Sequence, residues 1–259
     1  MALFTDAEVI GLEDLQQFES ALVEVASTHD INVSTKINLA LASIGDLLSL
    51  WLLRSDKSDP QWLTRRALGL STVVVTPTLY RWLCFEALSR FYSEAYNVQL
   101  NTRFQGKWTE YQAAALQASE MVRLSGIGIV YHALPKPELP LLSTGTGNAL
   151  QQTIFLQTAW IDSQGNEGAL SPVNALALPD NSSISAAMAE GAVNAPPAAA
   201  GWNVYVSTTE DTTYRQNSSP LQIGATWTLP VSGFIYGPTP IDGQSPNYFV
   251  VDPKRIQRG

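Results

Sequence analysis

No lysine, arginine or histidine occurs between Lys136 and Arg215, and this gap separates two parts of the chain that differ in composition. The part before the gap is charged and leucine-rich, and its apolar residues recur at helical spacing. The part inside the gap is rich in Gly, Pro, Ser, Thr and Ala, and its short alternating runs indicate strands. The sequence therefore predicts an α+β protein, with a helical part followed by a β part.

The length of 259 residues allows two modest domains, each with its own core, because 45% of the residues are hydrophobic. We expect an N-terminal helical bundle over 1–125, a Gly/Pro-rich linker over 126–150 and a β-sandwich over 151–245. The remaining residues, 246–259, are expected to form an extended C-terminal arm. Function is then to be sought in how these parts associate with other surfaces.

Charge and cysteine content exclude several classes of protein. The net charge of −8 argues against a groove that grips nucleic acid, because phosphate binding needs clustered Lys and Arg. The single cysteine, Cys84, cannot form an internal disulfide. No signal peptide is recognisable, and the longest apolar run, 37–53, is interrupted by polar residues. We therefore expect a soluble protein made in the cytoplasm, with no membrane segment.

Cap residues and apolar spacing place the secondary structure. Helices are expected to open at 5–6, after 34–35 and at 76–77, with a short helix over 61–68 and a last helix over 108–124. The helix that opens at 76–77 has so wide an apolar face that we expect it to be buried on two sides. That last helix should stop at Ser125-Gly126. Strands are expected over 153–161, 169–178, 183–189, 201–207, 221–223 and 226–229.

Residues with catalytic or metal-binding chemistry are few and scattered. His29 and His132 have no Cys or carboxylate at ligand spacing, and Cys84 has no partner base, so we expect no metal, no cofactor and no enzyme. Carboxylate pairs at 13–14, 56/59 and 210–211 would suit a glycosidase, but solvated surface charge is the favoured interpretation. Gly145-Thr146-Gly147-Asn148 lacks the Gly-Lys-Ser/Thr of a phosphate loop, and a linker is favoured there.

Three tryptophans at strand positions, Trp160, Trp202 and Trp227, have two interpretations. They would serve as a sugar-binding platform if exposed, or as the core of the sandwich if buried. Tryptophans on strands are more often core, so we favour the second interpretation.

The C-terminal arm is the candidate interface. It combines an apolar run with a basic end, and its candidate residues are Tyr248, Phe249, Val250, Val251, Lys254, Arg255 and Arg258. The apolar run would add a strand or fill a groove on a neighbouring subunit, while the bases would meet an acidic surface. A frayed terminus is the alternative.

Two sets of residues resemble known families. The run Arg81-Trp82-Leu83-Cys84-Phe85-Glu86-Ala87-Leu88, continuing through Ala95-Tyr96-Asn97-Val98-Gln99-Leu100 and Gln105-Gly106-Lys107-Trp108, is similar to neck or head-to-tail adaptor proteins of tailed bacteriophages. The hairpin around Trp160-Ile161-Asp162 and Gly165-Asn166-Glu167-Gly168, with Gly201-Trp202-Asn203-Val204-Tyr205-Val206-Ser207, looks like strands of fibronectin type III domains. These two elements occur in the reverse of the usual order, which suggests a rearranged sandwich.

These resemblances imply a structural virion protein. Head-to-tail adaptors form rings, by resemblance dodecameric, beneath the portal protein; they contact tail or neck proteins and extend the channel for genomic DNA without sequence-specific binding. An acidic lumen would let the DNA slide. Two other classes stay open: a baseplate, fibre or decoration component that binds a cell surface or glycan through the sandwich, and a hydrolase with an accessory β module.

Overall fold

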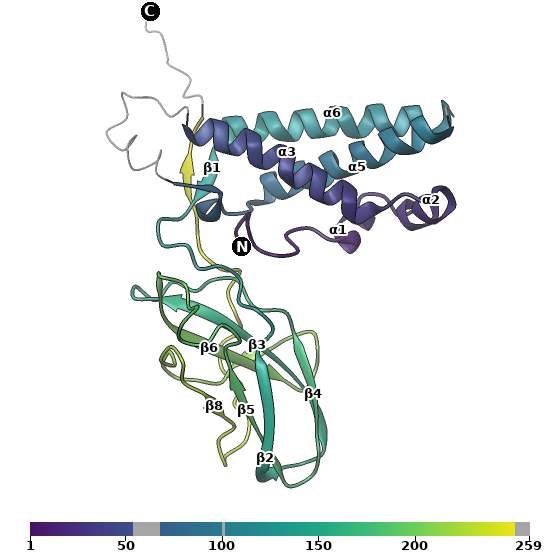
Figure 1. Ribbon diagram of the computed structural model, residues 1–259. Helices are drawn as coiled ribbons and strands as arrows, with labels where there is room; N and C mark the ends of the chain where they lie inside the picture. The colour runs from purple at the N-terminus through teal and green to yellow at the C-terminus, as the bar shows by residue number, and fades with distance from the viewer. Residues whose placement is uncertain (54–67, 100–101, 252–259) are drawn as a thin grey trace, which may run out of the picture. The chain divides into compact units, whose positions relative to one another are not determined.

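The computed structural model describes residues 1–53, 68–99 and 102–251 of the chain (Figure 1). The protein is α+β, with five α-helices in the N-terminal half and antiparallel sheets in the C-terminal half of the described chain. It divides into two compact units, a β unit of Met1–Asp6 and His132–Ser245 and a helical unit of Ala7–Tyr131 and the segment that begins at Pro246. This division differs from the predicted boundaries at both ends of the chain, because each terminal segment belongs with a distant part of the sequence.

In its described residues, the helical unit has three long helices, two short ones and a small sheet. The helices are α1 (Leu12–Gln16), α2 (Leu22–His29), α3 (Val33–Leu53), α5 (Pro77–Gln99) and α6 (Thr102–Ser125), with a 3₁₀ turn at Leu70–Thr72. Strands β1 (Ile127–Ile129) and β9 (Asn247–Phe249) pair antiparallel. A helix predicted over 61–68 lies largely outside the described residues.

Two helix boundaries are confirmed. α5 begins at Pro77, and the hydroxyl of Thr76 accepts a hydrogen bond from the N–H of Leu79 at 3.4 Å. α6 ends at Ser125, where Gly126 adopts a φ of +98° that favours glycine. Both boundaries depend on local chemistry, which sequence reasoning can see.

Two other predicted helix starts are wrong. Asp6 opens no helix, because its carboxylate instead accepts the N–H groups of Leu3 at 2.7 Å and Lys136 at 2.9 Å within the β unit. The helix expected after 34–35 begins before these residues, at Val33, and Asn32 supplies the capping oxygen to Thr35 N–H at 3.0 Å. The predicted last helix is longer than expected, since α6 starts at Thr102.

Helix α5 is the centre of the helical unit, as its wide apolar face predicted. It packs against α3, where the rings of Trp51 and Trp82 stack at 5.6 Å. It also packs against α6, where Tyr92 and Tyr111 stack at 5.6 Å. The buried thiol of Cys84 lies in this core.

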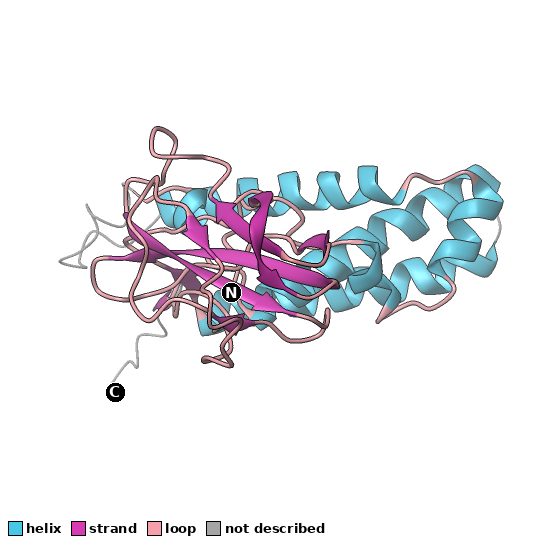
Figure 2. Ribbon diagram, turned by 90° about the horizontal axis from the view of Figure 1, so that it is seen from below, coloured by secondary structure: helices cyan, strands magenta, loops and turns pink. Residues whose placement is uncertain are grey.

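The β unit contains two antiparallel sheets (Figures 1 and 2). One has the strand order β2-β5-β8 and the other β4-β3-β6-β7. The strands are β2 (Leu141–Ala149), β3 (Gln152–Asp162), β4 (Asn174–Leu178), β5 (Ser182–Ala187), β6 (Ala199–Ser207), β7 (Tyr214–Arg215) and β8 (Trp227–Thr228). The strand expected at 221–223 is a single bridge from Leu221 to Trp202, and the predicted linker holds β1 and β2.

One hydrophobic core joins the two sheets of the β unit. Residues of both sheets belong to the same buried cluster, including Trp160 of β3, Trp202 of β6 and Trp227 of β8. The first two are fully buried and the third is 5% exposed. The tryptophans are therefore core residues, and the alternative of a sugar-binding platform built from them is wrong.

Candidate functional site

The predicted C-terminal interface is partly used within the chain itself. Tyr248 and Phe249 belong to β9 and pair with Gly128 and Ile127 of β1, so this strand pairing lies inside the helical unit, whereas the prediction placed it on a neighbouring subunit. Phe249 is buried, whereas Tyr248 is 54% exposed and Val250 is 39% exposed. Val251 is half-buried. The bases Lys254, Arg255 and Arg258 lie outside the described residues, and their contact with a neighbour stays a prediction.

A stripe of exposed leucines on α3 is an apolar surface feature of the helical unit that the sequence analysis missed. We call Leu39, Leu47, Leu50 and Leu53 the leucine stripe, and their exposed fractions are 46, 39, 39 and 56%. The opposite side of this helix faces the core, where Ile37, Ile44 and Leu48 are buried. The helix is thus apolar on two opposite sides. No described residue buries the side that carries the leucine stripe. The second set of leucines at helical spacing could have predicted this exposed apolar face from the sequence.

The length and composition of α3 alone also fit a membrane span, the single such helix among the residues searched. One third of the apolar stretch of this helix is buried inside the protein. Trp51 stacks on Trp82 and Lys36 forms an ion pair with Glu94, both of α5. These contacts are typical of a helix that packs in the core of a folded unit, with one face left for another surface.

A groove runs between α5 and α6 on the helical unit. It has a volume of about 530 Å³, and its lining residues are Phe18, Thr78, Arg81, Phe85, Ala114, Gln117, Ala118 and Met121. The α5 side chains that line it differ from Trp82 and Glu94, which meet α3. The groove and the leucine stripe are therefore separate surfaces of the same unit.

One unpaired charge lies on each of these two surfaces. Asp46 is exposed on α3 among the stripe leucines, and Arg81 is exposed at the groove. Neither forms an ion pair within the described part of the chain. The two surfaces are thus mainly apolar and carry opposite charges, as complementary surfaces do.

A buried carboxylate fixes the segment that carries Phe18 at the edge of the groove. Glu19 is 7% exposed, and its Oε2 atom accepts hydrogen bonds from Lys107 Nζ at 2.8 Å and Tyr111 Oη at 3.0 Å. Burial opposes the charged form, but these hydrogen bonds outweigh it, so the pKa of Glu19 is lowered. Phe18 also packs edge-on against Phe85, with ring centroids 5.0 Å apart. The wall of the groove is therefore rigidly held.

The residues weighed for catalysis are not brought together. Burial, with the nearby charge of Asp14, raises the pKa of the Cys84 thiol to about 12, which keeps it protonated. Asp14 itself accepts hydrogen bonds from Tyr80 and from Gly11 N–H. His29 and His132 belong to different units. Among the described residues, no three His, Cys, Asp or Glu side chains are grouped to hold a metal ion.

Glu210 and Asp211 are exposed on the β unit, and 56 and 59 lie outside the described residues. Gly145-Thr146-Gly147-Asn148, predicted as linker, belongs to β2 and borders a pocket.

Comparison with models of protein families finds no match. Comparison with curated proteins and comparison with solved structures also find no match. Function must therefore be inferred from the surfaces described above.

Proposed function

We propose that this protein is a structural component of a bacteriophage virion, a ring-forming head-to-tail adaptor that joins the portal to the tail. The observation that carries the proposal is the pair of separate apolar surfaces on the helical unit, the leucine stripe of α3 and the groove between α5 and α6. The resemblance to phage adaptors falls on the same region, from Arg81 to Trp108.

Two different complementary surfaces favour a head-to-tail contact between copies. The leucine stripe of one copy would lie in the groove of the next, with Asp46 of the first facing Arg81 of the second. Such a contact is heterologous, and it closes into a ring when the rotation between copies divides a full turn. A symmetric dimer would instead require one surface to pack on itself.

The charge of the chain suits a channel for DNA. A ring of copies that each carry −8 would repel the phosphates of genomic DNA and let it pass without sequence-specific binding. In this proposal the ring contacts the portal and the tail or neck proteins, and the bases at 254, 255 and 258 meet an acidic surface on one of these partners.

The β unit is proposed to be a sandwich of the fibronectin type III kind, with a rearranged strand order. Support comes from the single core that takes residues of both sheets. The unit would face outward from the ring or contact neighbouring copies.

Electron microscopy and native mass spectrometry of the purified protein, alone and mixed with its portal protein, test the proposal. Closed rings of one copy number are expected in at least one of the two samples. A monomer in both samples, at all concentrations, would contradict it. Rings that do not bind the portal would support the proposed ring assembly but refute the adaptor role.

A further inference from the structure

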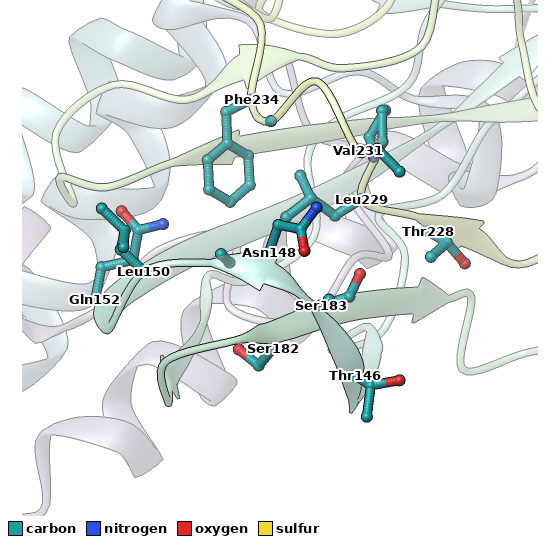
Figure 3. Close-up of a pocket in the computed structure, with 14 residues that line it drawn as sticks. Thr146, Asn148, Leu150, Gln152, Ser182, Ser183, Thr228, Leu229, Val231 and Phe234 are labelled. Atoms are coloured by element: carbon teal, nitrogen blue, oxygen red, sulfur yellow. The ribbon is translucent and has the colours of Figure 1, made fainter.

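The β unit contains a pocket that the adaptor role does not use. It has a volume of about 430 Å³ and lies where the end of β2 meets β5 and the loop after β8 (Figure 3). This volume is at the small end of the usual range for ligand pockets, roughly 300–1,000 Å³. Figure 3 shows the ring of Phe234 pointing from its loop toward the place where β2 turns into β3, around which Asn148 of β2, Leu150 and Gln152 of β3 lie.

A β-bulge shapes one wall of the pocket. β2 pairs regularly with β5 up to Thr146, and the register then shifts, so that Thr146 and Ala149 both align with Ser182. Gly147 lies so close to β5 that an added Cβ would be 2.5 Å from the carbonyl oxygen of Ser182. Glycine is therefore required, and the bulge turns Asn148 out of the ladder.

Polar side chains without protein partners line the pocket. Within the described chain, the amides of Asn148 and Gln152 and the hydroxyl of Ser183 make no hydrogen bond to protein. Each amide offers both a donor and an acceptor. They lie around one hollow, an arrangement typical of a site for a polar ligand.

Apolar groups complete the lining. The ring of Phe234 packs against the core of the β unit, which holds it in place. Leu150 is 76% exposed and Val231 is 86% exposed at the pocket. A ligand that alternates apolar C–H faces with hydroxyl groups would satisfy both kinds of lining.

The absence of charge narrows the class of ligand. None of the residues that line the pocket is charged, and β2, β5 and the segment between them lie in the stretch without Lys, Arg or His. A phosphate or carboxylate ligand would find no cation there. We propose that this pocket binds a neutral saccharide, with the sugar ring stacked on Phe234 and its hydroxyls bonded to Asn148, Gln152 and Ser183.

The test uses the full chain and a panel of neutral mono- and disaccharides of glucose, galactose and N-acetylglucosamine, with sialyllactose as the acidic comparator. Saturation-transfer NMR at millimolar sugar should detect at least one neutral member, and calorimetry then gives its affinity. Loss of one amide hydrogen bond in Asn148→Ala or Gln152→Ala should weaken binding about fivefold each. Phe234→Leu should abolish the saturation transfer while the chain stays folded by circular dichroism.

Gln151→Ala is the matched control, because Gln151 is exposed beside Gln152 and does not line the pocket. Its affinity for the sugar should equal that of the parent chain. No signal from any neutral sugar, preference for sialyllactose, or unchanged affinity in Asn148→Ala and Gln152→Ala would each overturn the proposal. The measurement needs no assembled ring, so its outcome is independent of the adaptor proposal.

Discussion

Removal of two stripe leucines, Leu39→Gln with Leu50→Gln, should weaken the proposed contact between copies without unfolding the chain. Leu39 is 46% exposed and Leu50 is 39% exposed, so both changes are made on the surface. Full burial of a leucine side chain is worth about 1.5–3 kcal/mol, and burial of the exposed part of each is worth roughly 1 kcal/mol. The double variant should therefore lose about 2 kcal/mol per contact, or about 30-fold in Kd.

Mass photometry across a concentration series measures this shift, and circular dichroism checks that the melting temperature is retained. The matched control removes two exposed leucines of the β unit, Leu139→Gln with Leu141→Gln, which are 47% and 60% exposed. Its assembly should equal that of the parent chain. Equal assembly of the stripe variant would refute the reasoning, and loss of assembly in the control would show that any exposed leucine suffices.

A charge exchange tests which surfaces meet. Asp46→Arg alone and Arg81→Asp alone each place like charges at the contact, and each should weaken assembly several-fold at low salt. The chain with both changes restores an opposite pair and should assemble more strongly than either single variant. Additive losses would show that the two residues do not face each other. Flotation of the parent chain with phosphatidylcholine vesicles would assign the stripe to a bilayer instead.

Three further predictions concern single buried groups. The Cys84 thiol, whose pKa burial raises to about 12, should react with a disulfide reagent about 100-fold more slowly in the folded chain than in urea, and fast labelling of the folded chain would contradict its burial. Glu19→Gln should cost about 1–2 kcal/mol in urea unfolding at pH 7, because Lys107 loses its carboxylate partner. The pKa of Glu19 is lower in the folded state than in the unfolded state. The stability that its carboxylate contributes is therefore fully present above the pKa of the unfolded state, and it is lost as the pH falls through the pKa of the folded state. The difference in unfolding free energy between the parent chain and Glu19→Gln should therefore be smaller in acid than at pH 7. An equal difference in acid and at pH 7 would exclude the ionised carboxylate as its cause. Asp162→Ala should cost about 1–3 kcal/mol, since the carboxylate accepts hydrogen bonds from two backbone N–H groups of its turn and from the amide of Asn166; an unchanged melting temperature would contradict this.

The sequence predicted those features that depend on neighbouring residues. Thr76-Pro77 and Ser125-Gly126 carry their own capping chemistry, and they mark the helix ends where the structure has them. Strands β3 and β6 were predicted because apolar residues such as Trp160 and Val204 face a buried core. Local pattern and burial agree in these elements.

Features that depend on distant residues were missed. β2 is mostly exposed and contains Gly145 and Gly147, so it has no apolar alternation to mark it as a strand. β9 pairs with β1, which lies more than a hundred residues earlier, and neither strand is long enough to be recognised alone. Asp6 has the side chain of a good helix cap, yet its oxygen accepts the N–H of Lys136 instead. The pocket follows from the position of β2 and was missed for the same reason.

The chain passes between its two units three times, after Asp6, after Tyr131 and after Ser245. A single proteolytic cut at any one of these crossings leaves the units covalently joined through the others. Tension applied to one unit would likewise be divided among three backbone segments before it reached the other. Two units connected in this way should stay together under a force that would separate two domains joined by one linker.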